Sequence, residues 1–130
     1  MEKLTITIFA LLTLLVLVVL TGTAATLVQM PDNGKQIRVK AGEVIELALP
    51  GQAGTGYIWE FHHLDEAHFK VLRTAARSLA QPHRLGGPML QTWQIQILAP
   101  GQARLSLDYL RPWEGRARAV HHFTVMIHIY

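Results

Sequence analysis

Apolar and polar residues alternate with a period of two through most of the chain after residue 35. Successive side chains of a β-strand point to opposite faces, so this period indicates strands with one buried face. The alternating segments are residues 36–40, 43–49, 92–98, 104–109 and 122–130. Residues 57–61 add an aromatic and β-branched run, and residues 69–72 a weaker one.

Turn sequences rich in glycine and proline separate these segments. About seven short strands at this spacing predict an all-β fold, an immunoglobulin-like antiparallel β-sandwich. Residues 64–68 predict a single helical turn, and residues 74–80 fit either a strand or a loop. Trp59 and Trp93 lie within strand segments, where we expect them to pack in the core.

The N-terminal segment has a different pattern. Residues 4–20 carry no charge, follow a short charged start and precede the small residues 21–25. This order is typical of a secretory signal peptide cleaved near Ala25, and the length of the apolar helix also fits an uncleaved membrane anchor. We therefore predict a signal peptide or membrane anchor over residues 1–25 and one domain over residues 26–130. Both interpretations place that domain outside the cytoplasm, in the periplasm or secreted, with a tether if the helix is retained.

Composition excludes several functions. The chain has no cysteine, which excludes disulfides, thiolate metal sites and cysteine nucleophiles. The net charge of +3 comes from scattered basic residues, so we expect no nucleic-acid partner. No nucleophile elbow, paired-carboxylate constellation or phosphate loop is present, so we expect no enzymatic activity and no cofactor. The seven histidines include adjacent pairs, which point to opposite strand faces, and their spacing predicts no metal site.

Three longer loops have unusual content. Residues 51–57 contain glycines that allow close backbone approach to another surface. Residues 83–91 contain Gly86 and Gly87, and residues 111–116 begin with Arg111, Pro112 and Trp113. A tryptophan on a loop beside proline and arginine has the composition of a binding hot spot.

The loop motifs resemble those of the chagasin-like inhibitors of papain-family cysteine peptidases. The family's first loop, Asn-Pro-Thr-Thr-Gly-Tyr/Phe followed by Trp, is matched here by Thr55, Gly56, Tyr57 and Trp59. Its third loop, Arg-Pro-Trp/Phe, is matched by residues 111–113. The first loop departs from the family pattern at Gln52, Ala53 and Gly54, and the glycine-rich second loop departs at Pro88 and Met89.

The resemblance implies a monomeric, reversible and non-covalent inhibitor that fills the active-site cleft of a papain-family cysteine peptidase with three loops. It implies the following contact residues: Gly54, Thr55, Gly56, Tyr57, Gly86, Gly87, Arg111, Pro112 and Trp113. In this interpretation Thr55 offers its hydroxyl to the catalytic groups, Trp113 stacks on an apolar wall, and Arg111 pairs with a carboxylate or an aromatic ring. The departures at Ala53 and Gly54 predict a looser first loop and either weaker inhibition or a different target.

Two other functions stay open at this point. The same loops, or a sheet edge, would serve an adhesion or assembly module that binds a partner other than a peptidase. A histidine-based metal binder is the third alternative. An adhesion module should tolerate Thr55→Ala, and a metal binder should show metal-dependent melting.

Overall fold

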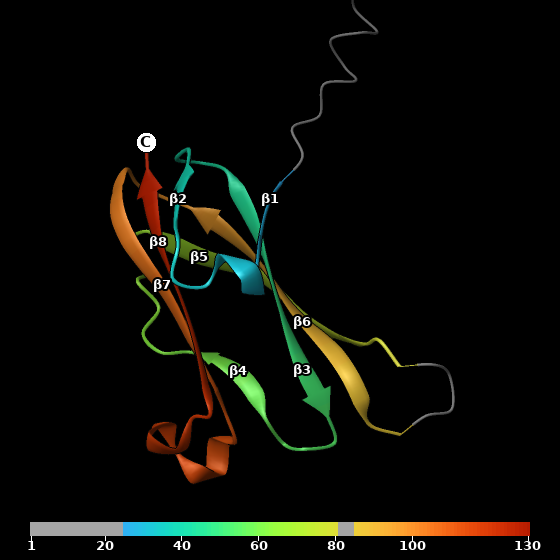
Figure 1. Ribbon diagram of the computed structural model, residues 1–130. Coiled ribbons are helices and arrows are strands. Elements are labelled where there is room, and N and C mark those ends of the chain that lie inside the picture. Colours follow the sequence, from blue (N-terminus) through green and yellow to red (C-terminus); the bar gives the residue numbers. More distant parts are fainter. Residues whose placement is uncertain (1–24, 81–84) are drawn as a thin grey trace, which may run out of the picture.

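The computed structural model describes residues 25–80 and 85–130, which form two β-sheets packed face to face (Figure 1). The elements are β1 (Thr26–Gln29), the 3-10 helix η1 (Met30–Asp32), β2 (Gln36–Val39), β3 (Val44–Ala53), β4 (Ile58–Phe61), β5 (Phe69–Ser78), β6 (Gly87–Ile97), β7 (Gly101–Leu110), the 3-10 helices η2 (Pro112–Glu114) and η3 (Arg116–Arg118), and β8 (His121–Ile129). Within these ranges no helix is long and apolar enough to cross a membrane. The predicted N-terminal helix lies outside the described residues.

The sheets are mixed, which corrects the predicted antiparallel sandwich. Sheet A has the strand order β1-β3-β6-β5, and sheet B has the order β2-β8-β7-β4. β1 pairs with β3 and β2 pairs with β8 in parallel, and the other neighbours are antiparallel. In both parallel pairs the chain crosses to the other sheet between the two strands. The sequence could not predict these directions, because alternation along one strand says nothing about the direction of its neighbour.

The predicted strand segments are confirmed, with longer bounds in several places. The weak segment at residues 69–72 continues as β5 to Ser78, so most of the ambiguous segment 74–80 is strand. β1 was not predicted, because its apolar residues Leu27 and Val28 are adjacent and show no alternation. Residues 64–68 contain one hydrogen-bonded turn, in which Asp65 accepts from the backbone N–H groups of His68 and Phe69.

The alternating apolar side chains meet between the sheets. Sheet A contributes Ile45, Leu47, Phe69, Trp93 and Ile95, and sheet B contributes Trp59, Leu105, Leu107, Phe123, Val125 and Ile127, all buried. Trp59 and Trp93 are each 4% exposed, which confirms their predicted place in the core. Burial of large apolar side chains is the main favourable contribution to the stability of this fold.

A buried glutamine links the two sheets near their loop-bearing end. Gln91, on β6 of sheet A, accepts a hydrogen bond from the backbone N–H of Trp59 (2.8 Å) and donates to its carbonyl oxygen (3.4 Å). Trp59 lies on β4, an edge strand of sheet B. The amide of Gln91 thus satisfies backbone groups that no neighbouring strand reaches.

Gln91→Met should lower the free energy of unfolding by about 1–3 kcal/mol, because it leaves the N–H of Trp59 buried without an acceptor. Urea denaturation measures the change. Gln94→Met is the matched control, since Gln94 lies on the same strand with an exposed side chain. Equal losses in the two variants would show that the link between the sheets contributes nothing.

Candidate functional site

Three loops lie together at one end of the sandwich, opposite the C-terminus (Figure 1). Loop 1 is residues 54–57, between β3 and β4. Loop 2 is residues 79–86, between β5 and β6, of which residues 81–84 lie outside the described residues. Loop 3 is residues 111–120, between β7 and β8, and contains η2 and η3.

Loops 1 and 2 are shorter than the sequence predicted. Residues 51–53 belong to β3 and residues 87–91 to β6, because these strands stay paired as far as Ala53 opposite Gly87. Glycine and proline in both segments predicted loops, but pairing with a distant strand outweighed this local preference. The predicted contact residue Gly87 therefore lies at the start of a strand. Gln52 and Ala53, which depart from the family's first-loop pattern, lie in β3.

Loop 1 turns through two glycines in the left-handed region. Gly54 and Gly56 both have φ of +81°, which side chains with a Cβ rarely adopt. Between them the Thr55 hydroxyl donates to the carbonyl oxygen of Gln52 (2.9 Å) and accepts from the N–H of Tyr57 (3.4 Å). The hydroxyl proton of Thr55 is thus used inside the loop, whereas the resemblance implied that it meets a partner's catalytic groups.

Arg111 joins loop 3 to loop 1. Its Nε donates to the carbonyl oxygen of Thr55 (2.9 Å), and its guanidinium lies 4.5 Å from the ring centre of Tyr57. Another guanidinium nitrogen pairs with Glu114 (3.1 Å). Arg111 therefore pairs with a carboxylate, stacks on an aromatic ring and holds two loops together within its own chain, and its contact with a peptidase stays a prediction.

Trp113 rests on loop 1 and still presents most of its surface to solvent. A methyl group added at Gly56 would lie 2.3 Å from Cη2 of Trp113, so the indole packs directly on the glycine backbone. The tryptophan is nevertheless 72% exposed. A large aromatic side chain held in place but left open is typical of a binding anchor.

The base of loop 2 approaches loop 1 through glycines. Gly86 has φ of +77°, and a Cβ there would lie 3.5 Å from the carbonyl oxygen of Ala53. A Cβ at Gly54 would lie 3.8 Å from the Cα of Gly86. The two backbones are therefore in contact. Leu85 beside them is fully exposed.

An aromatic cluster beneath loop 1 supports it, and no motif in the sequence points directly to this cluster. Tyr109 of β7 packs against Tyr57 (ring centres 5.4 Å apart) and Trp59 (4.9 Å). Its hydroxyl accepts a hydrogen bond from the N–H of Gln52 (3.0 Å). The alternation in residues 104–109 places Tyr109 on the inward face, which is the only signal that could have identified it.

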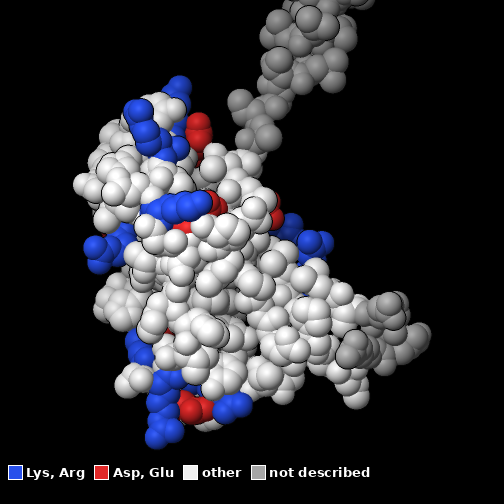
Figure 2. All heavy atoms as spheres, viewed as in Figure 1, with Lys and Arg blue, Asp and Glu red and all other residues white. Residues whose placement is uncertain are grey.

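Charge is unevenly distributed over the loop end. Residues 50–57 and 85–91 carry no charged side chain, whereas loop 3 carries Arg111, Glu114, Arg116 and Arg118. Glu114 pairs with both Arg111 and Arg118. On the face in Figure 2 the basic residues are scattered, and blue and red spheres lie side by side at the loop end. An uncharged centre with a charged margin matches the anatomy of protein–protein interfaces.

No group of three or more histidine, aspartate or glutamate residues in the described ranges has the geometry to hold a metal ion. A β-sandwich with loops 1 and 3 joined by a hydrogen bond and an exposed tryptophan between them is typical of proteins that bind another protein through their loops.

The chain belongs to the chagasin family of peptidase inhibitors. The family model described as "Chagasin family peptidase inhibitor I42" matches residues 38–127. Chagasin of Trypanosoma cruzi is 29% identical to this chain over 98 residues, which cover 73% of this chain and 89% of chagasin.

Solved structures share the fold. The cysteine protease inhibitor EhICP2 of Entamoeba histolytica superposes with a TM-score of 0.70 at 18% identity, covering 82% of this chain and 95% of EhICP2. PbICP-C, solved in complex with falcipain-2, gives a TM-score of 0.59 at 17% identity, covering 84% of this chain and 93% of PbICP-C. The all-β architecture with two mixed sheets is therefore that of chagasin-like inhibitors.

Proposed function

We propose that this chain is a reversible, non-covalent inhibitor of papain-like cysteine peptidases that blocks the active-site cleft with loops 1, 2 and 3. Family membership and the complex of a structural relative with falcipain-2 support the class of target. The observation that carries the proposal is Trp113, which is 72% exposed yet packed on Gly56 beside the uncharged centre of the loop end.

Loops 1 and 3 are held in place within the free chain. Hydrogen bonds within loop 1 and from Arg111 to Thr55 hold their backbones, so binding costs little additional conformational entropy. A glycine backbone at the centre of the end can approach a cleft closely, and no covalent step is required. The predicted contact residues all lie in or beside these loops.

The domain would act outside the cytoplasm. We propose residues 1–25 as a signal peptide or membrane anchor and residues 26–130 as one immunoglobulin-like inhibitor domain, monomeric and periplasmic or secreted. The charge pattern of residues 1–25 supports this interpretation.

Titration of the purified protein against papain, with residual peptidase activity as the readout, tests the function. We expect reversible inhibition that saturates at one inhibitor per peptidase. No inhibition of papain or of several related peptidases at micromolar concentration would reject the proposal and favour the adhesion or assembly module. The partner of such a module would then be sought with the loop end of this protein as bait.

Arg111→Lys should raise the inhibition constant about tenfold, because lysine keeps the charge but loses the Nε hydrogen bond to Thr55 and the planar stack on Tyr57. Arg38→Lys is the matched control: Arg38 stacks on Tyr130 near the C-terminus, with its guanidinium carbon 5.0 Å from the ring centre. If the two variants inhibit equally well, the link between loops 1 and 3 has no part in inhibition.

A further inference from the structure

Asp108 is a buried carboxylate on the outward face of sheet B. It lies on β7, opposite Glu60 of β4 and His122 of β8, and it is only 3% exposed. Aspartate is seldom buried unless it is paired. The outward face of a two-sheet sandwich is normally solvated, so side chains from elsewhere must cover this residue.

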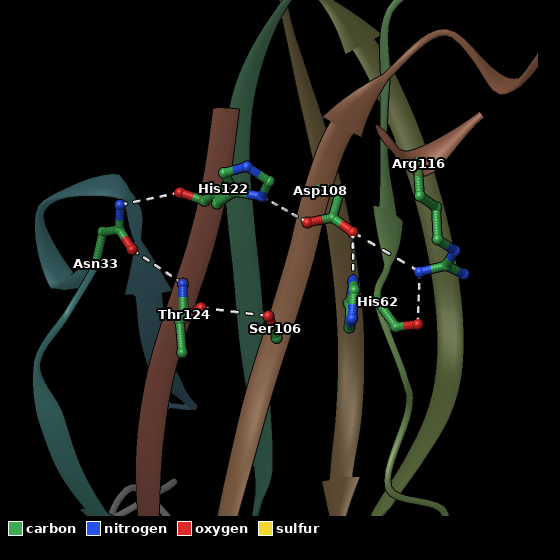
Figure 3. Close-up of polar contacts among 7 residues, drawn as sticks. All are labelled: Asn33, His62, Ser106, Asp108, Arg116, His122 and Thr124. Atoms are coloured by element: carbon green, nitrogen blue, oxygen red, sulfur yellow. Dashed lines mark hydrogen bonds and ion pairs between the residues drawn. The ribbon is translucent and has the colours of Figure 1, made fainter. Parts of the chain in front are cut away.

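Side chains from three elements cover Asp108 (Figure 3). Nδ1 of His62, just after β4, lies 2.7 Å from Oδ2, and Nδ1 of His122, on β8, lies 2.7 Å from Oδ1. Arg116, from η3 in loop 3, lies 3.7 Å from Oδ2 and also donates to the carbonyl oxygen of His62. An ionised carboxylate only accepts hydrogen bonds, so both histidines donate from Nδ1.

We propose that Asp108 is a positioning residue of the inhibitor, which fixes loop 3 through Arg116 and His62 and so holds Trp113 in one place at neutral and at acidic pH. This inference rests on the proposed function, which it deepens. Asp108 itself lies on β7, outside the three loops.

Loop 3 needs such an attachment at both of its ends. η2 and η3 are single 3-10 turns, which have little stability of their own. Arg111 ties the first half of the loop to Thr55 of loop 1. Arg116 ties the second half to Asp108 and to the backbone of His62. Trp113 lies between these two attachments.

The attachment is built to persist as histidines gain protons. The Nδ1–H of an imidazole ring can donate to Asp108 whether the ring is neutral or protonated. Burial opposes ionisation of Asp108, but hydrogen bonds and charge from His62 and His122 outweigh it and lower its pKa. The charged and titratable groups that face Asp108 are Glu60, His62, His63, Asp65, Arg104, Arg116 and His122.

The sign of the pH dependence follows from that lowered pKa. A carboxylate with a folded-state pKa below its unfolded value stabilises the fold at pH values above the unfolded pKa. That stabilisation is lost only as pH falls through the folded pKa. The stabilisation by Asp108 is therefore kept from neutral pH down to a lower pH than an aspartate with an ordinary pKa would allow.

Two variants and one control test the proposal on the full chain. Asp108→Asn removes the charge and leaves an amide that can accept from one histidine only. Arg116→Gln removes the link to loop 3 from a side chain that is 48% exposed, so it tests loop attachment without a buried defect. Arg104→Gln is the control, because Arg104 borders the same hollow and has no hydrogen bond to Asp108.

Inhibition of papain is measured from pH 8 to pH 5, and hydrogen exchange of the Arg118 and Ala119 amides is measured in the free protein. These amides donate to Gly115 and Arg116 within loop 3. We expect exchange to become about tenfold faster in both variants and the inhibition constant of Arg116→Gln to rise about tenfold at every pH. For Asp108→Asn we expect a rise of about tenfold as well, because the amide oxygen can accept a hydrogen bond from only one of the two histidines. Wild type and Arg104→Gln should show neither change.

Failure of the positioning role and failure of the proposed function give different results. If both variants match wild type in their hydrogen-exchange rates and in their inhibition constants at every pH, the positioning role is overturned. A wild-type protein that fails to inhibit any papain-like peptidase would overturn the proposed function, while the exchange rates would still decide whether Asp108 fixes loop 3. Intrinsic tryptophan fluorescence at each pH establishes that the variants are folded.

Discussion

Gly56→Ala should weaken inhibition of papain about 100-fold, because it displaces Trp113 from its place on loop 1. The added methyl group would lie 2.3 Å from Cη2 of Trp113, closer than any real contact, so the indole or loop 1 must move. The φ of +81° adds backbone strain. Residual papain activity, measured against inhibitor concentration, gives the inhibition constant.

Gly34 provides a matched control for this substitution. It has the same φ of +81°, but a Cβ there meets no atom within 4 Å. Gly34→Ala therefore carries the backbone strain without the contact, and it should lower stability while inhibition by the folded protein stays unchanged. If Gly34→Ala and Gly56→Ala weaken inhibition to the same degree, strain rather than the position of Trp113 explains the loss.

Trp113→Ala is the second substitution with a large expected effect. We expect the inhibition constant to rise about 100-fold, since truncation of a central interface tryptophan often costs more than 2 kcal/mol of binding. The side chain is 72% exposed in the free protein, so the melting temperature should hardly change. Inhibition kinetics and thermal melting on the same sample separate the two quantities.

Tyr130→Ala is the control for Trp113→Ala, because Tyr130 is also an exposed aromatic residue (59%) and lies at the opposite end of the sandwich. Its loss should leave inhibition unchanged. Full inhibition by Trp113→Ala would exclude loop 3 as an anchor. A large fall in melting temperature would mean instead that Trp113 acts as a structural cover for loop 1.

Local patterns predicted the strands well and their partners poorly. Residues 92–98 alternate cleanly, and all of them except Leu98 form the end of β6, with Trp93 buried. The extension of β3 through Pro50 and Gly51 could not be predicted, because it depends on pairing with Leu90 and Met89 of β6. Local composition and non-local pairing favoured different structures there, and the pairing prevailed.

In the candidate site, too, local motifs could be predicted from the sequence and contacts between distant residues could not. The motif at residues 111–113 located loop 3, but the hydrogen bond from Arg111 to Thr55 joins residues 56 positions apart in the sequence. A single sequence without the fold cannot reveal such a contact. Asp108 also lies on the polar face of an alternating strand, and only the convergence of His62, His122 and Arg116 makes it buried.

The position of β8 has a consequence for biosynthesis. β8 follows all the other described strands in the chain, yet it lies inside sheet B, between β2 and β7. While it remains in the ribosome, β2 has no partner in its sheet, and the apolar side chains of β7 face an incomplete core. Because most of the contacts in sheet B are distant in sequence, the nascent chain cannot close its sandwich early. The two sheets can therefore close over a complete core only once β8 is available to pair with both β2 and β7.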